Sequence, residues 1–141
     1  MVLAAILILC LIVASYFLTA RVVEKEVGER AISIAEITAE HPLVIEGLKQ
    51  DRSTVELQRL ALSIQQRADA EYVVIGDENE IRYAHPVKER IGKQMVGDDN
   101  EKALVHGQSY VSIAEGTLGK ALRGKAPVKD EQGNIIGVVS V

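Results

Sequence analysis

The first part of the chain is apolar without interruption. Residues 1–20 contain no charged side chain, and Arg21 is the first. Twenty residues in a helix extend about 30 Å, the thickness of the hydrocarbon core of a bilayer, and no polar stripe marks a face that would pack on a soluble domain. The segment also lacks the basic start and the A-x-A pattern of a cleaved signal peptide. The pattern therefore predicts a transmembrane helix.

From Arg21 onward the pattern changes to that of amphipathic helices. Apolar residues recur every three or four positions over residues 22–41, which predicts a membrane-proximal helix that ends before Pro42. Its narrow apolar stripe suits pairing with a second copy of the chain or packing on the chain's own domain. An S-x-x-E capping box at residues 53–56 predicts a further helix, with apolar residues at helical spacing as far as Ile64.

Beyond Ala70 the period shortens to that of strands. Short apolar or alternating runs predict five strands, with turn residues at 76–79 and 133–134 and a short helix at 99–106. The predicted strands span residues 72–75, 81–85, 110–114, 121–128 and 135–141. Helices followed by short strands indicate an α+β fold. The expected organisation is a transmembrane helix (1–20), a membrane-proximal helix (21–41) and one domain (42–141).

Composition excludes several classes of function. The chain carries 16 basic and 20 acidic side chains, a formal net charge of −4, whereas a nucleic-acid surface normally shows a basic excess. Aromatic residues make up 4% of the chain and tryptophan is absent, which disfavours stacking on bases. The single cysteine, Cys10, rules out an intramolecular disulfide and a multi-cysteine metal cluster. We expect no cofactor and no metal.

Cationic residues in two predicted strands are the main candidates for chemistry. Arg123 and Lys125 are two apart, so both side chains point to the same face, where they repel each other unless an anion lies between them. Arg82 and His85 can grip a carboxylate, but alternation places them on opposite faces unless the chain bends before Pro86. A solvated strand face is the alternative interpretation for either pair.

Two further patterns carry no chemistry. Residues 119–126 (GKALRGKA) nearly match a P-loop, yet Ala126 stands where the magnesium-binding hydroxyl belongs and no long helix follows. Neither a G-x-S-x-G elbow nor an HExxH motif occurs, and no serine has a sequence cue that pairs it with a base. We therefore expect no catalytic residues.

Three motifs in this order resemble a known family. They are RYAHPVKERIGKQMVGDD (residues 82–99), GTLGKALRGKAPV (116–128) and NIIGVVSV (134–141). Together they resemble the extracytoplasmic sensor domains of the CitA/DcuS family, which are sensor histidine kinases for citrate and four-carbon dicarboxylates. The resemblance covers nearly the whole chain and is closest to the citrate sensors. It implies a PAS-like domain of the PDC type, with N-terminal helices and a central antiparallel sheet of about five strands, preceded by one transmembrane helix.

The resemblance also implies a set of ligand-binding residues. They match the family's cationic ring, its closing segment and a hydroxyl in the last strand: Arg82, His85, Gly116, Thr117, Leu118, Arg123, Lys125 and Ser140. Val74 stands where some relatives carry a hydroxyl, and Met95 where dicarboxylate sensors carry an aromatic residue. Lys125 adds a cation that the dicarboxylate sensors lack, so citrate is the expected ligand and a four-carbon dicarboxylate the alternative.

The family's layout sets the remaining expectations. The last strand would lead into a second transmembrane helix and a cytoplasmic kinase that acts on a response regulator, both absent from these residues. The chain would then be a membrane-anchored extracytoplasmic sensor without catalytic activity, in a homodimer of a bacterial cell membrane. Two rivals stay open: a sensor of the same fold that serves a chemoreceptor or another membrane receptor, and an anchored dimerisation module that binds no ligand.

Overall fold

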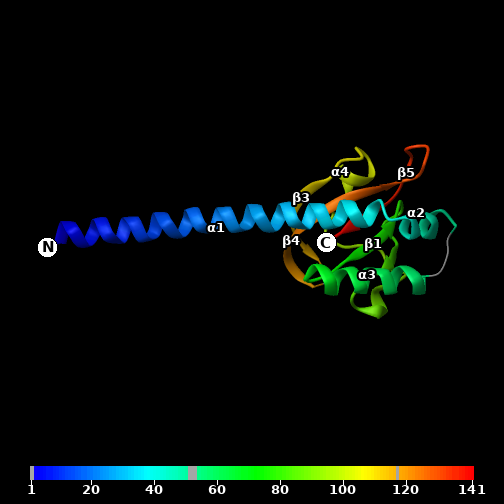
Figure 1. The fold of residues 1–141 in the computed structure, drawn as a ribbon, viewed down its shortest axis with the longest axis horizontal. Helices are drawn as coiled ribbons and strands as arrows, with labels where there is room; N and C mark the ends of the chain where they lie inside the picture. Colours follow the sequence, from blue (N-terminus) through cyan, green and yellow to red (C-terminus); the bar gives the residue numbers. More distant parts are fainter. Residues whose placement is uncertain (1, 51–53, 117) are drawn as a thin grey trace.

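A computed structural model describes residues 2–50, 54–116 and 118–141 of the chain (Figure 1). Within these residues, one long helix, α1 (Val2–Ala39), leads into a domain of three further α-helices and five strands. The other helices are α2 (Pro42–Lys49), α3 (Thr54–Ala68) and α4 (Glu101–Leu104), with a 3-10 turn at Lys88–Arg90. The strands are β1 (Val74–Asp77), β2 (Arg82–Ala84), β3 (Tyr110–Gly116), β4 (Gly119–Lys129) and β5 (Ile135–Ser140).

Helix α1 has the length and apolarity of a membrane span. It is the one candidate span within the described residues, and the rest of the molecule buries none of its apolar window. Figure 1 shows the N-terminal half of α1 projecting away from the domain, while its C-terminal half lies along the sheet. The helix continues without a break past Arg21, so the predicted membrane-proximal helix is its second half, ending at Ala39.

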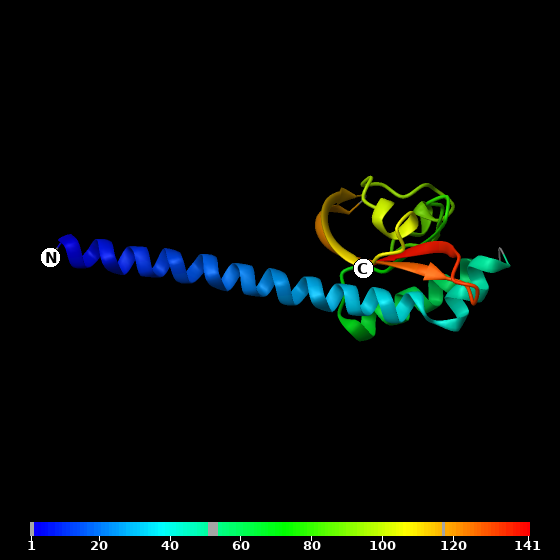
Figure 2. The same ribbon diagram turned by 90° about the horizontal axis from the view of Figure 1, so that it is seen from above.

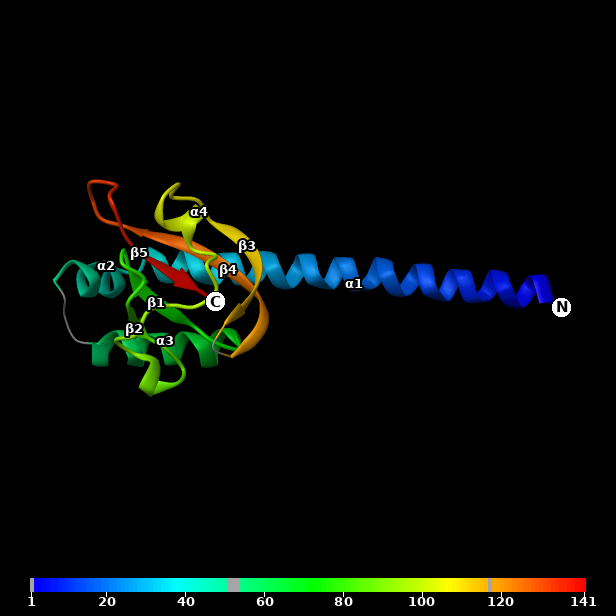
Figure 3. The same cartoon turned by 180° about the vertical axis from the view of Figure 1, so that it is seen from behind.

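The five strands form one antiparallel sheet in the order β2-β1-β5-β4-β3. Helices α1, α2 and α3 cover one face of this sheet, while α4 and the connection before it lie on the other (Figure 2). Helix α1 packs mainly on β4, and α3 packs on β1 and β2. Seen from behind, the C-terminal end lies beside β4 (Figure 3), where Val141 and Gly124 exchange two backbone hydrogen bonds of 2.9 Å.

Alternation along the central strands separates an apolar face from a polar one. The apolar face joins the helices in one buried cluster that includes Ala35, Ala39, Val44, Leu57, Ile75, Ala126, Val128 and Val139. Successive residues of a strand point to opposite faces, so the neighbours of these residues point away from the helices. Among them, Val74, Ser140 and Lys125 lie side by side across β1, β5 and β4, because Ser140 is in register with both of the others.

Gly124 allows the backbone of α1 to lie directly on β4. A Cβ atom at this position would overlap the backbone of Ala31 and Ile32. No side chain therefore stands between the helix and the strand at this point, and only glycine fits there without moving one of them.

The structure corrects two details of the predicted elements. Helix α2 was not predicted: Pro42 follows the end of α1, but it is also the first residue of α2, where its missing N–H costs nothing. The Nδ1 atom of His41 caps this helix by accepting the N–H of Leu43 at 3.2 Å. The first strand was predicted too early, since it begins at Val74 and runs into the predicted turn. The predicted cap Ser53 lies outside the described residues.

Candidate functional site

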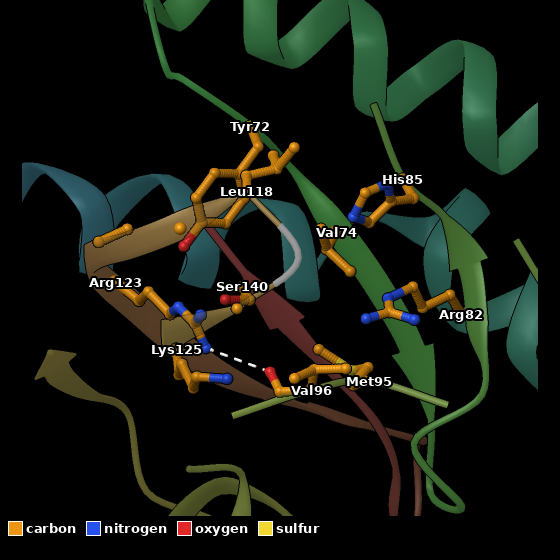
Figure 4. A pocket seen from close by; sticks show the side chains of 13 residues that line it. Tyr72, Val74, Arg82, His85, Met95, Val96, Leu118, Arg123, Lys125 and Ser140 are labelled. Carbon is orange, nitrogen blue, oxygen red and sulfur yellow. Dashed lines mark hydrogen bonds between the residues drawn. The ribbon is translucent and has the colours of Figure 1, made fainter. Parts of the chain in front are cut away.

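A cavity of about 40 Å³ lies on the sheet face opposite α1, α2 and α3 (Figure 4). Its walls come from β2, β4 and β5, from the start of β1 and from the connections around the sheet. The lining residues are Tyr72, Val74, Arg82, His85, Met95, Val96, Gly116, Leu118, Gly119, Ala121, Arg123, Lys125 and Ser140. The described lining contains two arginines, a lysine and no carboxylate, so the cavity suits an anion.

Two larger hollows lie along α1 and have a different character. Their volumes are about 410 and 330 Å³, and each is lined by both acidic and basic side chains. Charges of both signs neutralise each other locally, so neither hollow presents the one-sign cluster that would select a charged ligand.

Arg82 reaches the cavity from β2 and is held by backbone carbonyls. Its Nη1 donates to the oxygen of Gln94 at 2.5 Å and to that of Lys93 at 3.3 Å. Burial lowers the pKa of Arg82, and the charges of Arg90 and Arg123 lower it further. The guanidinium still stays charged at neutral pH. It forms no ion pair with a carboxylate of the described residues, so an incoming anion would relieve an uncompensated buried charge.

His85 is fixed through both its backbone and its ring. Gln58 of α3 donates from Nε2 to the His85 carbonyl at 2.7 Å and accepts the His85 N–H at 2.8 Å. The Nδ1 atom of His85 lies 2.9 Å from the backbone nitrogen of Val87 and 3.1 Å from its carbonyl oxygen, so either tautomer of the ring finds a partner there. Burial lowers the pKa of His85. The expected bend before Pro86 is present, because β2 ends one residue before His85, and Arg82 and His85 reach the same cavity.

An internal carboxylate lies between the two cations of β4. Asp99 Oδ1 is 3.1 Å from Arg123 Nη1 and 3.0 Å from Lys125 Nζ. The hydroxyl of Ser112 donates to Asp99 Oδ2 at 2.5 Å. The two cations are only 6% and 1% exposed, so their charges need such a partner. The spacing of Arg123 and Lys125 called for an anion, but it did not indicate that the chain itself supplies one from 24 residues earlier.

Lys125 lies at the floor of the cavity with competing influences on its charge. Burial lowers its pKa, whereas the neighbouring Asp99 raises it. Lys125 Nζ also donates to the side-chain oxygen of Asn100, which is itself buried. Ser140 of β5 is in register with Lys125 and presents its hydroxyl to the same cavity.

Two glycines make room for the guanidinium of Arg123. A Cβ atom at Gly116 would overlap Arg123 Nη2, and one at Gly97 would lie 2.6 Å from Arg123 Nη1. Gly97 also has a φ of +129°, a conformation that other residues rarely adopt. Gly116 and Gly97 therefore leave the space that the guanidinium of Arg123 occupies, and Gly97 is a position that the sequence pattern did not indicate.

Tyr72 is a cavity residue that the sequence pattern also left out. It is 8% exposed, and its hydroxyl makes no hydrogen bond within the described part of the chain. Burial raises the pKa of Tyr72, while the positive charge of Arg123 lowers it. A buried hydroxyl without a partner can bind a polar ligand group. The available signal was the predicted strand 72–75, in which Tyr72 and Val74 are two residues apart and would point to the same face.

The structure gathers most of the predicted ligand residues in one place. Seven line the cavity: Arg82, His85, Gly116, Leu118, Arg123, Lys125 and Ser140. Thr117 lies outside the described residues, and ligand binding by all eight stays a prediction. The P-loop-like segment 119–126 is part of strand β4, which confirms that it is not a P-loop. Across residues 2–50, 54–116 and 118–141, no group of three or more His, Cys, Asp or Glu side chains could hold a metal ion.

Comparison with known proteins gives a consistent result. Residues 18–141 match the family model described as single cache domain 3. The chain is 52% identical over 122 residues to the sensor protein CitS of Halalkalibacterium halodurans, covering 86% of this chain and 23% of that protein. It is 38% identical to the sensor histidine kinase CitA of Klebsiella pneumoniae, covering 82% and 21%. This chain therefore spans about a quarter or less of the length of these relatives.

A solved structure shares both sequence and fold with this chain. The crystal structure of the E. coli DcuS sensor domain superposes with a TM-score of 0.76 at 34% identity, covering 83% of this chain and 87% of that one. The sensor domain of the Vibrio cholerae histidine kinase DctB superposes with a TM-score of 0.70 over 90% of this chain and 55% of that one, but at 13% identity it supports the fold alone.

Proposed function

Because this chain belongs to the single cache domain 3 family and is a sensor domain of the CitA/DcuS type, we propose that its cavity binds a small carboxylate, with citrate as the preferred ligand. One observation carries the proposal. Arg82 and His85, in and just after β2, and Arg123 and Lys125, in β4, are far apart in the sequence, yet all four line a single cavity. Arg82, Arg123 and Lys125 bring three buried positive charges together, and Asp99 balances only one of them, so a bound polyanion gives the cluster its physical reason.

The cations lie on different sides of the cavity and would hold different carboxylates. Arg82 and His85 lie at the β2 side, while Arg123 and Lys125 lie on β4 (Figure 4). The hydroxyls of Tyr72 and Ser140 add polar contacts between them. Each charge-assisted hydrogen bond contributes about 1.5–3 kcal/mol, so a few suffice for micromolar affinity after the entropy cost of binding.

Lys125 supports citrate over a four-carbon dicarboxylate. Two arginines can each bind one carboxylate, and a third carboxylate left without a cation in a desolvated cavity would cost several kcal/mol. Lys125 supplies the additional positive charge on the floor of the cavity. A dicarboxylate sensor remains the alternative form of the proposal, and the ligand panel below separates the two.

Signalling would follow from how the ligand joins separate strands. A polyanion that contacts Arg82, Arg123 and Ser140 bridges β2, β4 and β5, and it binds best when these strands are drawn together. Its higher affinity for that closed arrangement shifts the equilibrium between conformations. In the whole protein, we place this domain outside the cytoplasmic membrane, in a homodimer, with the change passed to a histidine kinase and its response regulator.

Calorimetry of the chain in lipid nanodiscs tests the proposal, with citrate, isocitrate, malate, succinate and fumarate as ligands. Citrate should bind most tightly, and Arg82→Ala or Arg123→Ala should weaken binding by roughly 2–5 kcal/mol. Lys120→Ala, which removes an exposed cation from the same strand as Arg123, is the matched control and should leave affinity unchanged. Tighter binding of a dicarboxylate would select the alternative, and no binding of any carboxylate would refute the proposal.

A further inference from the structure

Asp99 places a carboxylate against two of the cations that line the cavity, Arg123 and Lys125. We infer that Asp99 is a resident competitor of the ligand: it engages Lys125 and one edge of Arg123, and thereby limits how strongly the cavity prefers three carboxylates to two. This inference rests on the carboxylate site proposed above. It assigns a specificity-determining role to a residue outside the cavity lining.

The contacts of Asp99 show which cationic groups it occupies. Its Oδ1 is shared by Arg123 Nη1 and Lys125 Nζ, at 3.1 and 3.0 Å, and its Oδ2 also lies 3.3 Å from Arg123 Nη1. The same Nη1 donates to the backbone oxygen of Val96 at 3.4 Å. A ligand carboxylate that approaches Lys125 therefore meets an ammonium group that is already paired and a negative charge beside it, which repels it.

Asp99 is held in place on several sides, so it acts as a fixed part of the site. Ser112 of β3 donates to its Oδ2 at 2.5 Å, and the hydroxyl of Tyr110 donates to its backbone oxygen. Burial, together with the negative charge of Asp99, raises the pKa of Tyr110 to about 12. The next residue, Asn100, is buried and donates to the carboxylate of Glu80 at 2.7 Å. These bonds tie the backbone and the carboxylate separately, so displacement by a ligand would break several of them.

The charges around the cavity show the consequence. Arg82 and Arg123 are permanent cations, the Asp99 charge beside Lys125 favours its protonated form, and the lowered pKa of His85 favours the neutral ring. With Asp99 included, the net charge at the cavity is two positive units rather than three. Two ligand carboxylates would have their charges fully balanced. A third carboxylate would be stabilised less than it would be by a Lys125 that had no Asp99 beside it. Removing the Asp99 charge should therefore favour a tricarboxylate selectively.

The test uses two ligands that differ by a single carboxylate. Tricarballylate has the carbon chain of glutarate with one additional carboxylate on its central carbon, so the ratio of their affinities measures what the third carboxylate contributes. Calorimetry at pH 8 on the chain in nanodiscs gives this ratio for the unmodified chain and for Asp99→Asn, which keeps the shape of the side chain and removes its charge. We expect the ratio to rise about tenfold or more in favour of tricarballylate.

Asp98→Asn is the matched control. It removes the same charge from an exposed neighbour of Asp99 whose φ of +48° asparagine tolerates. Its ratio should stay within about twofold of the unmodified chain, since an exposed charge is screened by water and salt. An equal rise in both variants would mean that general charge, and not the position of Asp99, sets the ratio, and it would overturn the inference.

The other outcomes are also decisive. An unchanged or lower ratio in Asp99→Asn would show that Asp99 supports the cations instead of competing for them. Asp99→Ser gives a second uncharged variant if the first is unstable in thermal unfolding, and failure of both to fold would make the role of Asp99 structural and overturn the inference. If the unmodified chain binds some carboxylates but the ratio does not move, only this inference fails. If it binds none, the proposed function fails as well.

Discussion

Three consecutive residues of β4 face opposite sides of the sheet, where one allows close packing and the other two place charge in the cavity. Gly124 faces α1 and lets the helix backbone touch the strand, whereas Arg123 and Lys125 face the cavity and carry buried charge. The helix side consists of apolar side chains and close packing. The cavity side consists of cations that are held by carbonyls and by one aspartate. The comparison teaches that the fold's stability comes mainly from one face, which leaves the other free to hold charges that cost stability and bind ligand.

This division predicts that substitutions on one face affect stability and substitutions on the other face affect ligand affinity. A substitution on the helix face should lower the free energy of unfolding and leave the affinity of the remaining folded protein unchanged. A substitution on the cavity face should lower affinity with little loss of stability. The following variants test this contrast in order of expected effect.

Gly124→Val should have the largest effect, on stability. The new side chain would overlap the backbone of Ala31 and Ile32, neither of which can yield without moving α1 away from β4. We expect the free energy of unfolding to fall by about 4 kcal/mol, above the usual cost of overpacking because backbone atoms are involved. Urea denaturation measures it, with the exposed Lys120→Ala as control at less than about 0.5 kcal/mol. A cost below about 1 kcal/mol would contradict the tight contact of helix and strand.

Arg123→Met should show the reverse behaviour. Citrate affinity should fall by about 3 kcal/mol, since the variant removes a buried charge that faces the ligand. The free energy of unfolding should change by no more than about 1 kcal/mol, because Asp99 keeps Lys125 and Ser112 as partners. Calorimetry and urea denaturation of the same sample give both values. A large loss of stability with unchanged affinity would reverse the proposed roles of the two faces.

His85→Gln should reveal a smaller effect that depends on pH. Burial holds the pKa of His85 below its ordinary value of 6.5, so the folded empty domain favours the neutral ring and loses stability as pH falls through about 6.5. A bound polyanion favours the protonated ring. The affinity of the unmodified chain relative to His85→Gln should therefore rise as pH falls from 7 to 5, by about tenfold.

Comparing the two chains at each pH cancels the titration of the ligand itself. A constant ratio of their affinities between pH 5 and 8 would show that His85 does not bind the ligand through its charge. Thermal unfolding of the two empty chains over the same range checks the stability part of the prediction separately.

Tyr72→Phe should have the smallest effect. The variant removes a buried hydroxyl that has no partner in the described residues, so stability should stay equal or rise slightly. Citrate affinity should fall by about 1 kcal/mol, the value of one neutral hydrogen bond. Unchanged affinity in calorimetry would mean that the hydroxyl does not contact the ligand.

The sequence predicted the fold more fully than the site, for physical reasons. Alternation and turn residues predicted all five strands; in β4, for example, Ala126 and Val128 face the core while Lys125 faces the cavity. Helix α2 escaped prediction because the same proline can stand after one helix and begin the next. The order of the strands in the sheet depends on packing between distant segments, which no local pattern encodes.

At the site, the sequence predicted the cations but not what compensates them. The spacing of Arg123 and Lys125 indicated that both side chains share one face. Arg82 and His85 were indicated as ligand residues by a motif that resembles the CitA/DcuS family. Asp99, in contrast, lies in an irregular connection where no period fixes the direction of a side chain, and Gln58 acts on His85 from a helix that is distant in sequence. Such partners become visible only when the chain is folded, since their roles depend on distances and not on residue type.

The contact at Gly124 has a mechanical consequence for the membrane segment. Side chains between two elements usually absorb small shifts by changing rotamer, but here the strand that carries the cations touches helix backbone directly. A displacement of β4 at this point therefore presses directly on the backbone of α1, with no side chain between them to absorb it. Helix α1 runs unbroken from this contact to its apolar N-terminal half. One continuous helix therefore connects the strand that carries Arg123 and Lys125 with the segment long enough to cross a bilayer.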